Sequence, residues 1–109
     1  MITSAGYRIG PGEIEEALLR HPAVRLAAAI GVPDPVRTES IKVFVVLAEG
    51  QHPSEALEGE IREFVKSRLA RHEYPRAIEF LDSLPTTTTG KIMRRELRER
   101  ERAKSRAAQ

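Results

Sequence analysis

One lysine near the C-terminal end of this chain stands where it could act on an anion. Lys91 follows four threonines and a glycine, in the run PTTTTGK that begins at Pro85. Proline ends a strand because its nitrogen cannot donate to a sheet ladder, the threonines favour local hydrogen bonds, and Gly90 permits a tight bend. The run therefore predicts a flexible polar loop that projects a compact ammonium toward an anion bound elsewhere.

A phosphate-binding P-loop is the nearest alternative, because it also ends in glycine and lysine. The pattern fails at two positions: Pro85 stands in place of the first glycine, and Ile92 in place of the hydroxyl residue that binds magnesium. A lysine after a glycine is otherwise most often a solvated surface residue. The local pattern alone therefore leaves two interpretations open: a lysine that reaches an anion bound elsewhere, and a solvated surface lysine.

Four motifs along the chain favour the lysine that reaches an anion bound elsewhere. Residues 85–95, PTTTTGKIMRR, resemble the final core motif of the adenylate-forming superfamily, which contains acyl-CoA synthetases, adenylation domains of peptide synthetases and luciferases. Residues 6–15, GYRIGPGEIE, look like the loop that follows the hinge in that family. Residues 21–24 (HPAV) and 31–35 (GVPDP) recur between them in the expected order, so the resemblance covers about residues 2–100.

The resemblance implies a ligase that runs two half-reactions in one active site. A carboxylic acid and MgATP first give an acyl-adenylate and pyrophosphate; a thiol, usually that of coenzyme A, then displaces AMP. Tyr74-Pro75-Arg76 and residues 31–35 are most similar to short- or medium-chain acyl and aryl CoA ligases. ATP with Mg²⁺ and coenzyme A are therefore implied as substrates of the complete enzyme, with none bound by this fragment alone.

The first half-reaction is assigned by resemblance to the C-terminal motif. Lys91 matches the catalytic lysine of adenylation, which approaches the carboxylate and the α-phosphate, and Thr89 and Gly90 belong to the loop that positions it. A fixed positive charge in a water-poor site stabilises the negative charge that builds at phosphorus. Arg94 and Arg95 match the basic pair of the motif, for which we expect phosphate or interdomain contacts.

The second half-reaction is assigned by resemblance to the N-terminal motif. Gly6 and Tyr7 would line the path of the pantetheine arm, since a residue without Cβ lets the arm pass close to the backbone. Arg8 would contact the AMP phosphate, which suits a guanidinium. The residues themselves leave two alternatives open: Gly6 could only form a ribbon turn, and Arg8 could pair with Glu13 or Glu15.

A further contact with coenzyme A is implied on a helix. Lys66 matches by spacing a basic residue that helps hold the coenzyme A nucleotide in some relatives. It lies on an amphipathic stretch, so a merely solvated lysine is the other interpretation. Coenzyme A and the acyl-adenylate are thus the small-molecule partners that the resemblance implies.

We expect residues 1–109 to form one C-terminal mobile lid domain, whose partner is a large N-terminal domain absent here. No Gly/Ser/Thr-rich ATP loop, ribose-binding aspartate or acyl pocket can be recognised, so the chain alone is not expected to catalyse. The hinge residue of the family, an Asp or Lys just before Ile2, is also absent. Lys91 is a candidate for a lysine acetyltransferase, because it lies on an accessible loop of small residues; acetylation would remove its charge.

Composition argues against several other functions. The absence of cysteine excludes disulfides and thiolate metal sites and agrees with a cytoplasmic location. His21, His52 and His72 lie too far apart in sequence for a local ligand pair, so we interpret them as surface or loop residues and expect no metal site. No apolar run approaches the roughly 20 residues of a membrane-spanning helix.

The positive charge is concentrated at the C-terminal end. Residues 91–109 carry eight Lys or Arg against three Glu, a net charge of +5, and the remaining residues have a net charge of −3. A basic segment can attract nucleic acid, but no aromatic side chain interrupts it to stack on bases. We therefore expect no nucleic-acid binding.

Two alternatives to a CoA-ligase lid stay open. One is the lid of an adenylation domain that serves the thiol of a carrier protein. The other is a free-standing, non-catalytic basic α+β module that binds RNA or an acidic partner.

Hydrophobic periodicity predicts an α+β domain with a small, mainly antiparallel three-stranded sheet. The first two strands are close in sequence, which favours antiparallel pairing. Two amphipathic helices are expected to cover one face of the sheet. A short N-terminal ribbon and a basic C-terminal helix complete the expected elements: the ribbon at residues 2–9, strands at 24–32, 41–47 and 75–81, helices after Pro11 and Ser54, and the terminal helix from Ile92.

Overall fold

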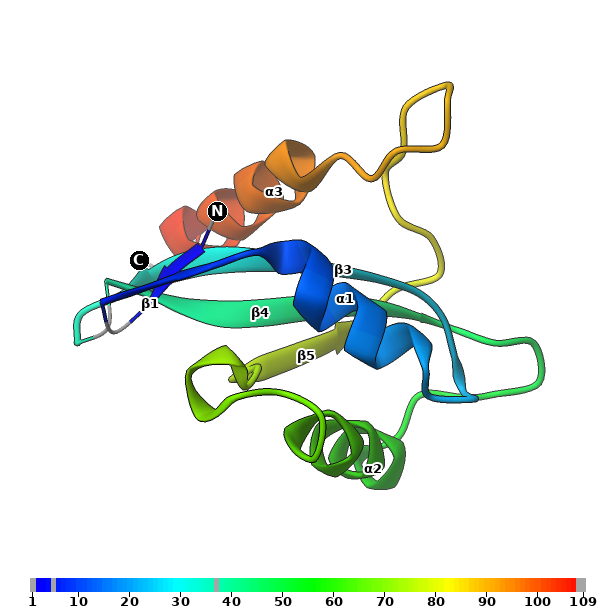
Figure 1. Ribbon diagram of the computed structural model, residues 1–109. Helices are drawn as coiled ribbons and strands as arrows, with labels where there is room; N and C mark the ends of the chain where they lie inside the picture. The colour runs from blue at the N-terminus through cyan, green and yellow to red at the C-terminus, as the bar shows by residue number, and fades with distance from the viewer. Residues whose placement is uncertain (1, 5, 37, 108–109) are drawn as a thin grey trace.

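The computed structural model describes residues 2–4, 6–36 and 38–107; the hinge position at Met1 lies outside these ranges. Within them, the chain forms five strands, three α-helices and one short 3-10 helix (Figure 1). In chain order these are β1 (Ile2–Ser4), β2 (Tyr7–Ile9), α1 (Pro11–Leu19), β3 (Val24–Asp34), β4 (Thr38–Leu47), α2 (Glu55–Lys66), η1 (Arg71–Glu73), β5 (Ala77–Phe80) and α3 (Arg94–Ala107).

The first two helices begin where the sequence indicates. Pro11 is the first residue of α1, where a missing N–H costs no hydrogen bond, and α1 ends before His21-Pro22. Ser54 precedes α2, and its Oγ accepts a hydrogen bond from the Leu57 N–H at 3.0 Å. Such a cap contributes about 0.5–2 kcal/mol to stability.

The β3–β4 hairpin is longer than predicted. The two strands pair antiparallel from Val24 opposite Leu47 to Asp34 opposite Thr38, so both extend toward the turn beyond residues 24–32 and 41–47. Pro33 does not end β3, because β3 lies at the edge of the sheet, where a residue without an N–H is tolerated.

The predicted three-stranded sheet is confirmed, and its third strand makes it mixed. Residues 77–80 of β5 pair in parallel with residues 42–45 of β4, and α2 lies in the crossover that parallel pairing requires. The ribbon of β1 and β2 is antiparallel and joins β4 through Ser4 opposite Thr38, so the complete sheet has five strands. The α+β class is therefore confirmed.

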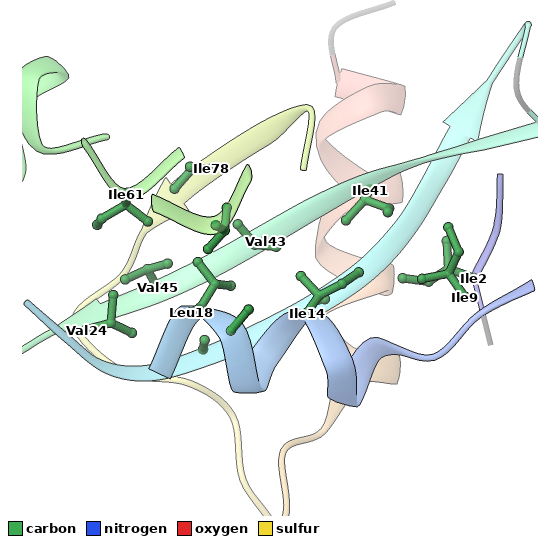
Figure 2. Packing of buried hydrophobic residues seen from close by; sticks show 14 residues of the cluster. Ile2, Ile9, Ile14, Leu18, Val24, Ile41, Val43, Val45, Ile61 and Ile78 are labelled. Atoms are coloured by element: carbon green, nitrogen blue, oxygen red, sulfur yellow. The ribbon is translucent and has the colours of Figure 1, made fainter. Parts of the chain in front are cut away.

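Both faces of the sheet are buried, because β4 carries apolar side chains at successive positions. Ile41, Val43 and Val45 point to the face covered by α1 and α2, as expected for two helices on one face (Figure 2). Phe44 and Val46 point to the opposite face, which α3 covers (Figure 1). The other side chains of this first cluster that Figure 2 labels are Ile2, Ile9, Ile14, Leu18, Val24, Ile61 and Ile78.

The basic C-terminal helix starts later than predicted. Ile92 is paired with Thr86 in an isolated antiparallel bridge, so α3 begins at Arg94. Leu97 is fully buried in the second cluster with Leu84, and the rest of the described helix surface is mainly charged. One apolar anchor alone thus holds little of α3 on the sheet.

Ion pairs supply further attachment along the second half of α3. Lys42 of β4 places its Nζ 2.9 Å from Glu79 Oε1 and 2.6 Å from Glu101 Oε1, and Lys104 Nζ lies 2.7 Å from Glu79 Oε1. Burial by itself raises the pKa of Glu79, but hydrogen bonds from Lys104 and Lys42 outweigh it and hold that pKa below its ordinary value. This network connects α3 to β4 and β5.

His21 lies in the loop between α1 and β3, which agrees with the interpretation of the histidines as surface or loop residues, but it is buried there. Its Nδ1 accepts a hydrogen bond from the Ala23 N–H at 3.0 Å. Nε2, which must then carry the proton, lies 3.2 Å from Glu60 Oε2. His21 therefore closes the turn between α1 and β3.

Neither a metal cluster nor a membrane span is found in the part of the chain that the structure describes. No three His, Cys, Asp or Glu side chains in these ranges are grouped to hold a metal ion. None of the described helices is both long and apolar enough to cross a bilayer.

Candidate functional site

The loop that carries Lys91 is closed at its base by two backbone contacts. Thr86 and Ile92 form the antiparallel bridge, and the Met93 N–H donates to the Pro85 carbonyl at 2.8 Å. In Figure 1 the loop is the yellow-to-orange segment that projects from the body of the domain beyond the start of α3. The loop therefore presents its tip away from the sheet.

The tip is a tight turn with its own hydrogen bonds, which the expectation of a flexible loop did not include. The Gly90 N–H donates to the Thr87 carbonyl at 2.9 Å, and the Thr87 N–H donates to the Lys91 carbonyl at 2.8 Å. Gly90 has φ +86°, a conformation that glycine adopts without the strain a side chain would bring. This geometry explains why glycine precedes the lysine.

Thr87 is a positioning residue that sequence reasoning missed. Its Oγ1 accepts a hydrogen bond from the Lys91 N–H at 3.1 Å and lies 3.0 Å from the Thr89 Oγ1. The hydroxyl of Thr89, which was predicted to position the lysine, contacts the hydroxyl of Thr87, and its role stays a prediction. Four identical threonines gave no signal to distinguish the one that bonds the lysine backbone.

Lys91 itself is exposed at the side of this turn. Among the described residues no carboxylate lies within ion-pair distance of its ammonium, whereas most cations of α3 have an acidic partner. The arrangement is a cation without a local counter-ion on a tip with a defined backbone. It can neutralise an anion that another surface presents.

The ribbon with the second group of predicted residues is a β1–β2 turn. Gly6 lies at this turn with φ +85°, and a Cβ built there would meet nothing within 4 Å. Arg8 is exposed on β2, and no described carboxylate pairs with it. Glu15, one of the two partners considered for Arg8, forms an ion pair with Arg94 instead. The turn explains the glycine conformation and leaves the space beside it open.

Tyr7 and Lys66 are brought to one short segment by aromatic contacts. The Tyr7 ring stacks on His72 of η1, with centroids 3.9 Å apart and planes inclined by 8°. Lys66 Nζ lies 5.9 Å from the centroid of the Tyr74 ring, just after η1, and 3.6 Å from Glu63 Oε1. Tyr7 and Lys66, the residues predicted to contact coenzyme A, therefore lie against His72 and Tyr74, respectively. No spacing in the sequence could have shown that Tyr7 stacks on His72.

A carboxyl group of the same segment influences α1. The proximity of Glu73 raises the pKa of Glu13, on α1, above its ordinary value. Glu73 Oε1 accepts a hydrogen bond from the Ala70 N–H at 3.0 Å, which closes the η1 turn.

The predicted residues form two separate groups. Gly6, Tyr7 and Arg8 lie on the ribbon, which Figure 1 shows at the left of the domain. Lys91 and Gly90 lie on the projecting loop at the upper right of the same view. The structure therefore does not bring the two groups together into one site; it presents them at different ends of the domain.

Arg94, for which phosphate or interdomain contacts were predicted, has a partner within this domain. Its guanidinium forms a two-pronged ion pair with the Glu15 carboxylate, with Nε 2.9 Å from Oε2 and Nη2 in contact with Oε1. A hydrogen bond to Glu15 raises the pKa of Arg94 above its ordinary value. Arg95, the next residue, is exposed, and its predicted contact is still a prediction.

Comparisons with known proteins agree with this fold. The family model described as the AMP-binding enzyme C-terminal domain matches residues 13–91. Acetyl-coenzyme A synthetase of Bacillus subtilis is 55% identical over 98 residues, 90% of this chain and 17% of that protein. Human mitochondrial acyl-coenzyme A synthetase ACSM2B is 52% identical over 103 residues, 93% of this chain and 18% of that protein.

A solved structure matches as closely. The crystal structure of an acyl-CoA synthetase of Brucella canis superposes with a TM-score of 0.91 and 53% identity, over 95% of this chain and 19% of that chain. This chain therefore spans about a fifth of the length of the proteins it matches.

The Thr87 hydroxyl should be required for the order of the Lys91 turn. We expect Thr87→Val to increase the exchange rate of the Lys91 amide about 2- to 10-fold, as for a lost exposed hydrogen bond. Thr87→Ser should retain slow exchange, because it keeps the acceptor. The measurement is amide hydrogen exchange by NMR, with Thr88→Val as the matched control; equal exchange in all four proteins would contradict the assigned contact.

Proposed function

Since this chain belongs to the family of AMP-binding enzyme C-terminal domains, we propose that it is the mobile lid of an AMP-forming carboxylic acid–CoA ligase. One observation carries this proposal: a single domain presents an unpaired lysine on an ordered loop on one side and an open glycine turn on another. A lid with two such surfaces can serve two successive reactions if it rotates between them.

Lys91 is proposed to act in the first half-reaction. A carboxylate oxygen attacks the α-phosphorus of MgATP, the bond to the bridging oxygen breaks, and pyrophosphate leaves with the electron pair. The Lys91 ammonium would neutralise charge on both anions as they approach and at the phosphorus as the bond forms. Magnesium would arrive with ATP, since no described cluster of this chain is suited to hold a metal ion.

The ribbon is proposed to act in the second half-reaction. The sulfur of a deprotonated thiol attacks the acyl carbon, and AMP leaves with the electron pair on its phosphate oxygen. The open space beside Gly6 would admit the pantetheine arm, and the exposed guanidinium of Arg8 would contact the leaving phosphate. Tyr7 and Lys66, held by His72 and Tyr74, would then contact coenzyme A.

Coenzyme A is favoured over a carrier-protein thiol by the relatives, whose names are those of coenzyme A synthetases. Supplying either coenzyme A or a phosphopantetheinylated carrier to the complete enzyme would separate the two. The acid differs among these relatives and would be selected by the large N-terminal domain. We propose the cytoplasm as the location, although the human relative is mitochondrial.

The alternative of a basic RNA-binding module is not adopted, because much of the positive charge of α3 is engaged. Arg94 pairs with Glu15, Arg100 with Glu96 and Lys104 with Glu79. Cations held by carboxylates in this way offer little net attraction for a phosphate backbone.

Replacement of Lys91 in the complete enzyme tests the proposal. We expect Lys91→Ala to slow ATP–pyrophosphate exchange about 10²-fold or more, as for a lost electrostatic stabiliser of the transition state. Thioester formation from supplied acyl-adenylate should stay within about 3-fold of wild type, since the lysine acts on the first half only.

Arg25→Ala is the matched control, because it removes an exposed positive charge from another part of the domain. It should leave both half-reactions near the wild-type rate. Equal losses in both halves for Lys91→Ala, or an intact adenylation rate, would refute the assigned role.

Acetylation should reproduce the effect of the substitution, because it removes the same charge. After treatment of the complete enzyme with a lysine acetyltransferase, we expect adenylation to fall in proportion to the fraction acetylated at Lys91. Mass spectrometry measures that fraction, and a deacetylase should restore the rate. Near-complete modification of Lys91 with full activity would overturn this regulatory proposal.

A further inference from the structure

Glu15 is a carboxylate at a position where α1 otherwise buries apolar side chains. Its neighbours Ile14 and Leu18 are fully buried in the first cluster, and Glu15 itself is only 7% exposed. Burial of a charge is costly unless it is paired and hydrogen-bonded. The contacts of Glu15 must therefore account for its presence.

Those contacts join three elements at the free edge of the sheet. Oε2 of Glu15 accepts a hydrogen bond from the Ala29 N–H of β3 at 2.8 Å, which satisfies an edge donor that β4 does not use. The same carboxylate accepts two hydrogen bonds from the Arg94 guanidinium. Helix α1 on one face and helix α3 on the other are thereby tied around the edge of β3.

Arg94 is also the point where the Lys91 loop enters α3. It is the first residue of the helix and follows Met93, whose N–H closes the base of the loop on the Pro85 carbonyl. On the other side of this base, Leu84 is buried in the second cluster with Leu97. The base of the loop is thus fixed by an apolar contact and by one ion pair.

We propose that Glu15 is a positioning residue for Lys91: through Arg94 it sets the first turn of α3 and hence the direction in which the loop presents the lysine. This inference rests on the proposed function of Lys91 in adenylation. Glu15 lies on α1, the helix that directly follows the Gly6 ribbon, and pairs with the first residue of α3, the helix that follows the Lys91 loop. One carboxylate thus connects the helix next to the ribbon with the helix next to the loop.

A purely stabilising role is the competing explanation, and a second ion pair further along α3 offers the comparison. Glu101 also anchors α3, by its ion pair with Lys42 at 2.6 Å, but it lies seven residues, about two helical turns, beyond Arg94 and therefore further from the loop. Loss of either anchor should loosen α3. Only loss of the Glu15 anchor should displace Lys91.

The experiment uses the complete enzyme with Glu15→Gln, which keeps the acceptor for Ala29 and removes the charge. We expect the kcat of adenylation to fall about 10- to 100-fold, as for a misplaced catalytic group, with KM for ATP and for the acid changed less than about 3-fold. Thioester formation from supplied acyl-adenylate should stay within about 3-fold. Glu101→Gln should lower the midpoint of thermal unfolding and leave adenylation within about 2-fold.

A double-mutant cycle with Lys91→Ala decides whether Glu15 acts through the lysine. In the Lys91→Ala background, Glu15→Gln should change adenylation less than about 2-fold, because the group it positions is gone. If Glu15→Gln does not fold, Arg94→Lys, which keeps the charge but loses the two-pronged contact, carries the same test.

The outcomes separate the two proposals. If Lys91→Ala slows adenylation and Glu15→Gln does not, or if Glu15→Gln costs the same in both backgrounds, the positioning role is wrong and the function of Lys91 stands. If Glu101→Gln slows adenylation as much as Glu15→Gln, the effect is one of general stability and the inference also fails. Intact adenylation in Lys91→Ala would overturn both.

Discussion

A carboxylate buried at the edge of a sheet is the constraint on which this small domain depends. The side chain of Glu15 cannot be left without partners, so β3 must supply a backbone N–H and α3 must supply a guanidinium. Meeting both demands places the start of α3 against the edge strand, across from α1. Since α3 buries only one large apolar side chain fully, this contact and the network at Glu79 and Glu101 set its position.

The same arrangement explains how one domain can carry two surfaces. The sheet is apolar on both faces, so helices must cover both, and the loops that connect them emerge on different sides (Figure 1). The ribbon before α1 and the loop before α3 each contain a glycine at positive φ, at Gly6 and Gly90. Each glycine allows a tight turn that stands clear of the packed sheet. We propose that a rigid rotation of the whole domain exchanges these turns at a site in the large domain.

Sequence reasoning recovered the parts of this fold that local patterns encode. Periodicity located the helices after Pro11 and Ser54 and the strands that became β3, β4 and β5. Residue types singled out Gly90, whose positive φ favours glycine. The family resemblance, carried by motifs rather than by periodicity, was confirmed by the match to residues 13–91.

Features that depend on contacts between residues far apart in the chain could not be predicted from local patterns. Periodicity does not say which strand pairs with which, so the parallel pairing of β5 was not foreseen. The partner of Arg94 is 79 residues away in the chain, and no spacing rule links it to Glu15. Burial of His21 likewise follows from contacts with Ala23 and Glu60 that only the folded chain assembles.

The most direct test of two surfaces for two half-reactions is the rate of thioester formation in Gly6→Leu of the complete enzyme. A leucine there should obstruct the thiol, and we expect thioester formation from supplied acyl-adenylate to slow about 10²-fold while adenylation stays within about 3-fold. Gly50→Leu is the matched control, because Gly50 has the same φ of +85° and the same open surroundings far from the proposed site. Equal damage to both half-reactions in Gly6→Leu, or equal damage in Gly50→Leu, would contradict the account.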